Sequence, residues 1–481
     1  MSRLGWGHQD RDADYNSLSR MPESSAVRIT EVVPFSDLPN ESAAMSKPIR
    51  LSIMMFLQFF VWGVFFVTMG GYLTNLFAAY EEKGTLNSIV ANIYATQTWA
   101  ALCAPLIVGF VADRLLNKEH VLAILHLAGA GLLYWVSTIE DSPTMFFVAM
   151  LAFFICYMPT LAVVNTLTFQ NVASPDRDFP KIRLWGTIGW IVGGLVVSQS
   201  FFGIFPLKVL PGVDDAGGSA VQFQLAAAAS LIYGIYAFTL PSSPPEGKGK
   251  PVNIIKLLGF DAISLLKNPS YAVFALCSFL ICIPLAFYYA RTGDFVKLMA
   301  FGDDTGGVMA LGQVSEIVFM ALVPVFLARL GVKKMLLVGM IAWALRYVLF
   351  GLMPSNSAML ILGIMLHGIC YDFFFVTGQL YTDRVAPPET RTSAQALVGL
   401  LTYGAGMLVG NYVSGFWGDS VVKLDATTAE GWEAGAAMFW LMPAVFAGVV
   451  AVIFALSFWD KTEVTEEMAE EKPIDLGPAT T

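Results

Sequence analysis

The amino-acid sequence predicts an all-α membrane protein with twelve transmembrane helices in two six-helix bundles. Of the 481 residues, 56% are hydrophobic and only 14% are charged, whereas about a quarter of the residues of soluble proteins are charged. Twelve apolar runs are each long enough to cross a bilayer, and two short patterns recur in both halves of the chain. A membrane β-barrel is excluded because its strands would be about half as long and would alternate in polarity.

Each expected span is an apolar run of about 20 residues or longer. A helix of about 20 residues, rising about 1.5 Å per residue, crosses a hydrocarbon core of about 30 Å. In chain order the expected spans are 50–77, 88–112, 120–138, 144–170, 180–203, 221–240, 270–290, 306–328, 334–353, 357–382, 392–417 and 434–459.

The chain divides at a linker rich in Ser, Pro, Gly and Lys, residues 242–250, which an amphipathic segment follows. Residues 1–46 lack the apolar core of a signal peptide, and an alternative is that translation starts at Met45. The expected parts are a disordered cytoplasmic N-terminal tail (1–46), an N-terminal six-helix bundle (47–241), a cytoplasmic linker with an amphipathic helix (242–269), a C-terminal six-helix bundle (270–459) and a cytoplasmic C-terminal tail (460–481).

The basic residues of the loops predict the orientation, because cytoplasmic loops hold an excess of Lys and Arg. With both termini in the cytoplasm, the loops between spans 2 and 3, 4 and 5, 6 and 7, 8 and 9, and 10 and 11 are basic. The loops on the other side carry few basic residues, namely Lys83, Lys208, Arg291, Lys297 and Lys423. We therefore expect a multi-pass protein of the cell (inner) membrane with both termini cytoplasmic.

The two halves of the chain resemble each other. Ile155-Cys156-Tyr157 in span 4 recurs as Ile369-Cys370-Tyr371 in span 10, and the Asp-Arg loop after span 2 recurs in weaker form after span 8. Both matches have nearly the same offset, which indicates parallel repeats of the kind that build major facilitator transporters, with the substrate near the midplane. The loop residues Gly109, Asp113 and Arg114 are expected to act in gating, since Gly permits close helix approach and the charges can bridge helix ends.

Four ionisable residues lie inside otherwise apolar spans. Such groups cost roughly 2.5–3.5 kcal/mol on insertion scales, so they usually face a polar cavity or a partner. They indicate a transporter, and they are Arg183, Glu316, Arg346 and Asp372.

Span 5 places a cation, a hydroxyl and an indole on one helix face. Arg183, Thr187 and Trp190 are at i, i+4 and i+7, and Gly189 and Gly193 are expected to form a close helix contact. An alternative is that Arg183 interacts with the membrane interface near its helix end.

Spans 8 and 10 add further polar residues. Gln313 and Glu316 share a face of span 8, and span 10 carries His367, Tyr371 and Asp372. Aromatic rings stack on a flat ligand while amides and carboxyls take its polar edge, so the set suits a nucleobase with its ribose. His367 is alternatively a core histidine. In span 9, a peripheral position in this fold, Arg346 is better explained as a structural ion pair or a snorkelling side chain.

Longer motifs combine these residues. They are Asp178-Phe-Pro-x-Ile-Arg183-x-Trp-Gly-Thr187-Ile-Gly, Gln313-x-Ser-Glu316, Ile341-Ala-Trp343-x-Leu-Arg346, Tyr371-Asp372-Phe-Phe and Ser393-Ala-Gln395. Together they resemble the nucleoside:proton symporter family of the major facilitator superfamily, from about residue 47 to residue 459. The resemblance implies two bundles of six helices, nucleoside uptake driven by a proton gradient, and a site lined by Arg183, Thr187, Gln313, Glu316, Tyr371 and Asp372.

The chain departs from the family pattern at several positions. Trp190 and Tyr371 stand where Phe is common, and His367 stands where Tyr is common. The polar amides expected in span 7 are replaced by the aromatic run that ends at Tyr288 and Tyr289. These changes remove hydrogen-bonding groups for the base and add aromatic surface, so the sequence does not predict which nucleoside is preferred.

Three classes of function compete. The favoured one is a proton-coupled nucleoside importer in which Asp372 and Glu316 carry the proton. The second is a transporter of the same fold for another polar solute, such as a sugar, or a drug exporter. The third is a membrane enzyme or receptor, which the sequence disfavours because it contains no nucleophile and base, no metal-ligand spacing and no phosphate loop.

Transport that is driven by an ion gradient requires no bound metal or cofactor. We expect a monomer in the lipid bilayer that binds no metal, cofactor or nucleic acid. Proton and sodium coupling are not distinguished by a motif.

Overall fold

A computed structural model describes residues 46–112, 114–213, 215–245 and 254–459. The expected N-terminal tail, much of the linker and the C-terminal tail lie outside the described residues. The described residues form one compact unit.

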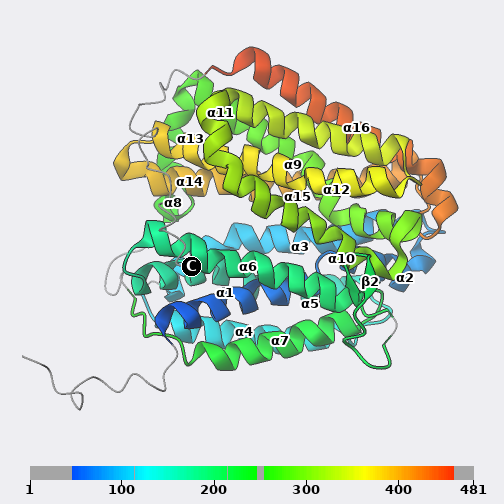
Figure 1. Cartoon of the computed structure of the whole chain (residues 1–481), viewed down its shortest axis with the longest axis horizontal. Helices are drawn as coiled ribbons and strands as arrows, with labels where there is room; N and C mark the ends of the chain where they lie inside the picture. Colours follow the sequence, from blue (N-terminus) through cyan, green and yellow to red (C-terminus); the bar gives the residue numbers. More distant parts are fainter. Residues whose placement is uncertain (1–45, 113, 214, 246–253, 460–481) are drawn as a thin grey trace, which may run out of the picture. The chain divides into compact units, whose positions relative to one another are not determined.

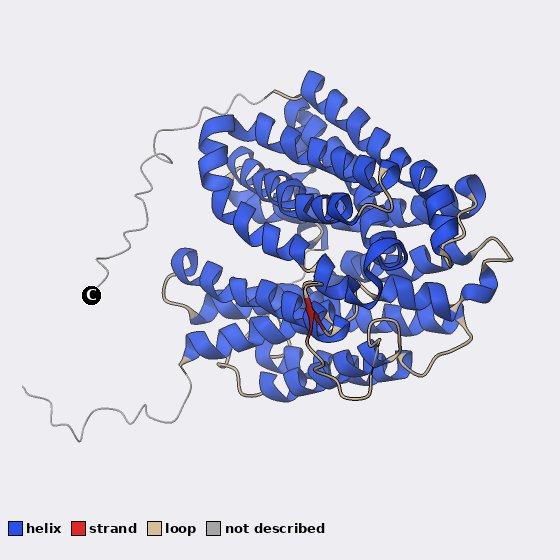
Figure 2. Cartoon of the chain, turned by 45° about the vertical axis from the view of Figure 1, so that its right-hand side comes forward, coloured by secondary structure: helices blue, strands red, loops and turns tan. Residues whose placement is uncertain are grey.

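The first half of the described chain is helical apart from one short hairpin, drawn in red in Figure 2. Its strands pair antiparallel, with Ser200 opposite Pro206 and Phe201 opposite Phe205. The elements are α1 (Lys47–Gly63), α2 (Met69–Leu76), η1 (Ala78–Tyr80), α3 (Leu86–Ile107), η2 (Val108–Ala112), α4 (Lys118–Val136), α5 (Pro143–Asn171), α6 (Pro175–Ser198), β1 (Ser200–Phe201), β2 (Phe205–Pro206) and α7 (Val221–Ala237).

The second half begins with two linker elements, α8 (Ile254–Leu257) and η3 (Phe260–Lys267), where the sequence predicts one amphipathic helix. The elements that follow are α9 (Pro269–Val296), η4 (Lys297–Phe301), η5 (Gly302–Asp304), α10 (Thr305–Met309), α11 (Leu311–Leu352), α12 (Ser357–Tyr371), η6 (Asp372–Val376), α13 (Thr377–Val385), η7 (Pro388–Thr390), α14 (Arg391–Gly399), η8 (Leu400–Gly406), α15 (Met407–Phe416), η9 (Trp417–Val422) and α16 (Ala429–Ser457).

Several helices start where a side chain caps them. Ser142 accepts the Met145 amide at the start of α5, and Asn268 accepts the amides of Ser270 and Tyr271 at the start of α9. Pro follows the cap directly in both helices, where its missing N–H costs nothing. The local sequence therefore specifies the positions at which these two helices begin.

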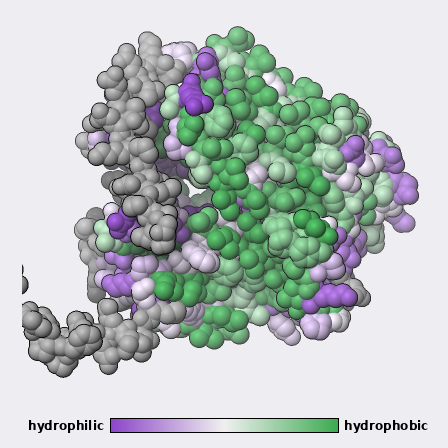
Figure 3. Space-filling view, in the orientation of Figure 1, coloured by the Kyte–Doolittle hydropathy of each residue, from purple (hydrophilic) through white to green (hydrophobic). Residues whose placement is uncertain are grey.

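Eight helical segments of the described chain are long and apolar enough to cross a membrane. Their outer surface is apolar, as the green surface in Figure 3 shows. The expected count of twelve is larger for four reasons. A turn at residues 64–68 separates α1 from α2, and α7 has only 17 residues. The apolar part of α6 begins with the charged residues Lys181 and Arg183. Finally, α11 continues through Gly331 although that residue has a non-helical φ of 69° and ψ of 171°.

The elements group into two halves (Figure 1). Helices α1, α4, α5, α6 and α7 lie together, and α11 to α16 lie together on the other side. The buried residues of the largest apolar cluster come from the second half, between Tyr271 and Phe458. Two further clusters consist almost entirely of residues of the first half, between Leu51 and Leu240. Each half therefore has its own hydrophobic core.

The predicted glycine contact of span 5 is confirmed. A Cβ added at Gly189 would lie 2.2 Å from the Phe56 carbonyl oxygen of α1, and one added at Gly193 would lie 2.8 Å from the Val64 nitrogen. Because only glycine fits there, α6 lies directly against α1. This contact fixes the face of α6 that carries the polar residues.

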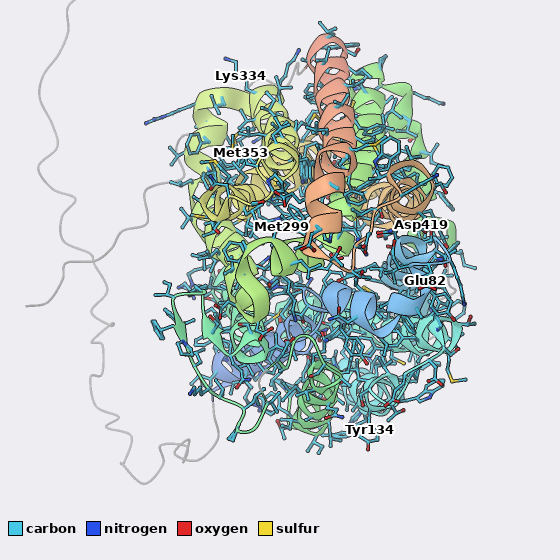
Figure 4. The ribbon with its side chains drawn as sticks, turned by 90° about the vertical axis from the view of Figure 1, so that its right-hand side faces the viewer. Glu82, Tyr134, Met299, Lys334, Met353 and Asp419 are labelled. Carbon is cyan, nitrogen blue, oxygen red and sulfur yellow. The ribbon has the colours of Figure 1, made fainter. Side chains whose placement is uncertain are left out.

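The two halves are joined at the end that carries the hairpin. The Asp419 carboxylate, from the second half, accepts the amides of Asn87 and Ser88 at 2.9 and 2.8 Å. Lys297 pairs with Asp215 across the same boundary. Figure 4 shows Asp419 and Glu82 on the two sides of this boundary. These contacts hold the halves together at that end of the helices.

Candidate functional site

One wall of the candidate site is formed by α6. Arg183, Thr187 and Trp190 all line the same cavity, as their spacing predicts. The Arg183 guanidinium lies over the Phe59 ring, 4.1 Å from its centroid. Trp190 packs edge-on against Trp62, with the ring centroids 5.1 Å apart. Arg183 therefore points into the molecule, and the alternative of an interfacial arginine is not supported.

The opposite wall forms where α11 crosses α12. A Cβ at Gly368 would lie 2.5 Å from the Ser315 carbonyl oxygen, so the two backbones touch. The Ser315 hydroxyl donates to the Met365 carbonyl at 2.6 Å and accepts the Gly368 amide at 2.8 Å. This crossing brings together the predicted residues of both helices, which are Gln313, Glu316, His367 and Tyr371.

Both walls enclose one cavity of about 130 Å³ between the halves. Seven of the eight predicted substrate-binding residues line it. The complete lining is Phe59, Trp62, Phe66, Gln97, Arg183, Thr187, Trp190, Tyr289, Gln313, Glu316, His367, Tyr371, Tyr403 and Met407. The lining thus combines a cation, a carboxyl, two amides and many aromatic rings.

The cavity offers polar groups that have no partner within the protein. Gln313 Oε1 and His367 Nδ1 are buried and form no hydrogen bond. Arg183 and Glu316 interact electrostatically from the two halves. A buried polar atom without a partner is costly unless a ligand or water satisfies it. The arrangement can therefore hydrogen-bond a polar ligand and stack aromatic rings on it.

Asp372 is the predicted residue that does not belong to this lining. It is fully buried at the start of η6, and neither carboxylate oxygen has a hydrogen-bond partner. Its charge nevertheless interacts with that of Glu316. The η6 segment is π-helical, a geometry that is frequent at functional sites. Asp372 thus lies next to the cavity wall without lining the cavity.

Arg346 lies behind the site, on α11. Its Nε donates to the Gly363 carbonyl of α12 at 2.9 Å, and its guanidinium lies 4.1 Å from the centroid of the Tyr288 ring of α9. The Tyr288 ring stacks in turn on His367, with an interplanar angle of 16°. Arg346 therefore bridges three helices through a hydrogen bond and a ring contact. It forms no ion pair among the described residues, and it is fully buried, so neither the ion pair nor the snorkelling that the sequence predicts is present, although its position behind the site agrees with a structural role.

Sequence reasoning missed several lining residues. The polar side chain of Gln97 in span 2 was a usable signal, because an amide inside an apolar helix needs a partner. Tyr403 and Met407 carried no such signal, since an aromatic or Met residue on an apolar helix is usually core. The aromatic run of span 7 was recognised, and its last residue, Tyr289, lines the cavity.

Two of the predicted gating residues, Gly109 and Arg114, do not line this cavity and follow the end of α3. Gly109 belongs to the π-helical η2. Asp113 lies outside the described residues.

Comparisons with known proteins agree with this architecture. A family model described as nucleoside H+ symporter matches residues 45–463. The putative nucleoside transporter YegT of Escherichia coli (strain K12) is 36% identical over 437 residues, which are 90% of this chain and 99% of that protein. The xanthosine permease of the same organism is 32% identical, over 86% of this chain and 96% of that protein.

Solved structures show the same similarity. A crystal structure of the nucleoside transporter NupG has a TM-score of 0.72 and 30% identity, over 87% of this chain and all of that chain. A mutant of NupG has a TM-score of 0.74. A bacterial homologue of the lysosomal transporter Spinster, at 13% identity and a TM-score of 0.62, shows similarity of fold alone.

Proposed function

Because the chain belongs to the nucleoside H+ symporter family, we propose that it imports nucleosides across the inner membrane by proton symport. The observation that carries the proposal is the central cavity, which both halves line with aromatic rings and polar groups. A nucleoside presents a flat base and a hydroxylated sugar, and this lining matches both parts. The family match favours nucleosides over sugar-like solutes or drugs.

Each lining group has a proposed role. The phenol rings and the indoles of Trp62 and Trp190, which pack edge-on against each other, offer faces on which the base stacks. Gln313 and Glu316 accept or donate hydrogen bonds at the polar edge or the ribose. Arg183 orients Glu316 by its charge and offers a planar fork of donors to the ligand. His367 and Tyr371 extend the polar surface at the positions where the chain departs from the family pattern.

Asp372 is proposed as the residue that carries the coupling proton, together with Glu316. An ionised carboxylate without partners in a buried position is costly, and neither oxygen of Asp372 has a partner. Its charge couples to Glu316, which does line the cavity. Uptake or loss of a proton at Asp372 would therefore be felt at the substrate site.

The eight long apolar segments correspond to twelve proposed spans. A further three are α1 with α2, α6 and α7, and the twelfth results from dividing α11 at Gly331. The charge distribution of the loops supports cytoplasmic termini. We propose that the transporter works as a monomer by alternating access, with Gly109, Asp113 and Arg114 acting in the gate.

The proposal is tested by uptake into proteoliposomes that contain the purified protein. Radiolabelled adenosine, guanosine, inosine, xanthosine, uridine and cytidine are offered with an acidic outside, with an inward sodium gradient, or with no gradient. Accumulation of at least one nucleoside only under the pH gradient is expected. Accumulation driven by sodium alone would overturn proton symport, and uptake of no nucleoside by the inserted protein would overturn the substrate class.

A further inference from the structure

The amide of Gln97 is a polar group of the central cavity to which the proposed function gives no role. Gln97 belongs to α3 and lines the cavity between the halves. Its neighbours Thr96 and Thr98 are buried, whereas Gln97 is only partly buried. No hydrogen bond joins its amide to another of the described residues. Because an amide inside an apolar helix is costly without a partner, the partner of Gln97 is expected to come from the cavity.

Helix α3 lies at the boundary between the halves, beside α15 of the second half (Figure 1). The two helices touch, because a Cβ added at Gly415 of α15 would lie 2.7 Å from the Ser88 Cα. Further along the same pair, Trp99 Nε1 donates to the Tyr412 hydroxyl at 3.1 Å. Gln97 therefore reaches the cavity from the place where the two halves meet.

The face of α3 that carries Gln97 is fixed by Tyr94. The two residues are three apart and share a helix face. The Tyr94 hydroxyl donates to the Phe66 carbonyl at 2.8 Å and accepts the Gly70 amide at 3.0 Å. The Tyr94 ring also packs edge-on against the Phe66 ring, with centroids 5.3 Å apart. Gln97 is thus one helical turn from the residue that contacts Phe66.

Phe66 belongs to the aromatic wall on which a base can stack. Its ring centroid lies 6.0 Å from that of Trp190 and 5.7 Å from that of Tyr289, which comes from the second half. All three rings line the cavity. A base that stacks on a ring face keeps its polar edge pointing sideways, in the plane of the base. The Gln97 amide lies to the side of these rings and can meet that edge.

The cavity lining contains two amides, one from each half, Gln97 and Gln313. A primary amide carries a donor and an acceptor side by side, which matches a base edge where an acceptor and a donor are adjacent. Arg183 offers donors only, and the sole lining residue from α9, Tyr289, offers a phenol. In the first half, Gln97 is therefore the lining residue that can pair with such an edge through two hydrogen bonds.

We propose that Gln97 is a specificity-determining residue, whose amide binds the edge of the nucleobase that carries an adjacent donor and acceptor. The inference rests on the proposed function. A nucleoside bound in this way contacts both halves, because Gln97 belongs to the first half while Gln313 and Glu316 belong to the second.

The test combines one substitution with one change in the ligand. Gln97→Met keeps the length of the side chain and removes its hydrogen-bonding groups. Purine riboside differs from inosine in lacking the N1–H and the 6-carbonyl of the base edge. Affinities of the purified full chain in detergent are measured by calorimetry for both ligands. If the wild type prefers pyrimidines, uridine and pyrimidin-2-one riboside form the equivalent pair.

Two net hydrogen bonds correspond to about 5–150-fold in affinity. Wild type is expected to bind inosine more tightly than purine riboside by a factor in this range. Gln97→Met should weaken inosine binding by a similar factor and change the affinity for purine riboside by less than about twofold. Gln97→Asn, which keeps an amide but shortens the side chain, should act in the same direction and serves if Gln97→Met does not fold.

Asn92→Leu is the matched control, because Asn92 is an amide of the same helix that does not line the cavity. Its affinities for both ligands should equal those of the wild type. Melting temperatures establish that each variant is folded.

Equal affinity of Gln97→Met and the wild type for inosine would overturn the role of Gln97. A loss of the same size for inosine and purine riboside would overturn recognition of the base edge. A loss that disappears with 2′-deoxyinosine or 3′-deoxyinosine would assign Gln97 to the ribose and would also overturn it. A wild type that binds no nucleoside would instead overturn the proposed function, and the role of Gln97 with it.

Discussion

The ionisable residues of the site differ in how they are satisfied. The Arg183 guanidinium lies over Phe59 and interacts with the Glu316 charge across the cavity. Arg346 has a carbonyl and an aromatic face as partners. Asp372 is fully buried, and neither of its carboxylate oxygens has a hydrogen-bond partner in the described structure. An unpaired buried charge lowers the stability of the protein. We therefore expect Asp372 to serve function and not stability.

Replacing Asp372 by Asn is expected to abolish accumulation of nucleoside against its gradient, because an amide cannot take up and release the coupling proton. Exchange of nucleoside across the membrane without a gradient should continue, since Asp372 does not line the cavity. Uptake under a pH gradient and counterflow are the two measurements. Asp383→Asn is the matched control, because Asp383 is on the following helix, α13, and half exposed. Undiminished accumulation by the inserted Asp372→Asn protein would remove this residue from proton coupling.

Arg183 and Arg346 are expected to respond differently to substitution. Arg183→Lys keeps the charge but loses the planar fork and the stacking on Phe59, so transport should fall while the melting temperature stays near that of the wild type. Arg346→Ala removes a fully buried side chain that bridges three helices, and should lower stability by about 2–5 kcal/mol.

Thermal melting in detergent and nucleoside affinity per folded molecule are measured for both arginine variants. Normal transport by Arg183→Lys would contradict its place in the site. Lost binding at wild-type stability in Arg346→Ala would contradict its structural role.

At the scale of elements, the sequence predicts the positions of the helices better than the positions at which an α-helix becomes a π-helix. Apolar runs and Pro-preceded caps locate the helices, and the i, i+4, i+7 spacing of Arg183, Thr187 and Trp190 correctly predicts that they share a wall. The π-helical turns at Asp372 and Tyr403 were not predictable. They depend on neighbouring helices that satisfy the loosened backbone, and a pattern along one segment does not contain that information.

The close contact of α1 with α6 depends on glycine. Gly189→Ala would put a Cβ 2.2 Å from the Phe56 carbonyl oxygen, so α6 must shift, at a cost of about 1–3 kcal/mol. The shift should also displace Thr187 and Trp190 and weaken nucleoside binding. Gly131→Ala in α4 is the matched control, because nothing lies within 4 Å of a Cβ there. Melting temperature and affinity are compared, and equal melting of the two variants would show that this contact tolerates a methyl group.

At the scale of the whole molecule, the site belongs to neither half alone. Arg183 comes from the first half and Glu316 from the second, and the cavity exists only between them. Contacts such as those of Asp419 with Asn87 and Ser88 close one end. The resemblance of the two halves in sequence predicts this shared site, because repeats of this type bind substrate at their interface. It does not predict which end is closed.

The closed end contains a carboxyl whose charge should depend on pH near neutrality. Glu81 lies in the turn before α3, outside the membrane-spanning segments. Burial, followed by the nearby Asp425 and Asp419, raises the pKa of Glu81 to about 7, while Arg291 partly opposes the rise. A carboxyl with a raised pKa binds more protons in the native than in the unfolded protein between about pH 4.5 and pH 7. Its neutral form therefore favours the native state at low pH, and stability is lost as the pH rises through this window.

Glu81→Gln is expected to remove this pH dependence, because the amide resembles the neutral carboxyl at every pH. At pH 8 the variant should melt about 1–3 °C above the wild type, and at pH 5 the two should melt together. The measurement is thermal melting in detergent at pH 5, 6, 7 and 8. Glu82→Gln changes the exposed neighbour in the same way, and its curve should run parallel to that of the wild type. If the melting curve of Glu81→Gln also ran parallel to that of the wild type, protonation of Glu81 would not affect the stability of the closed end. Repulsion between ionised Glu81 and the carboxylates of Asp419 and Asp425 would then not weaken the contact between the two halves.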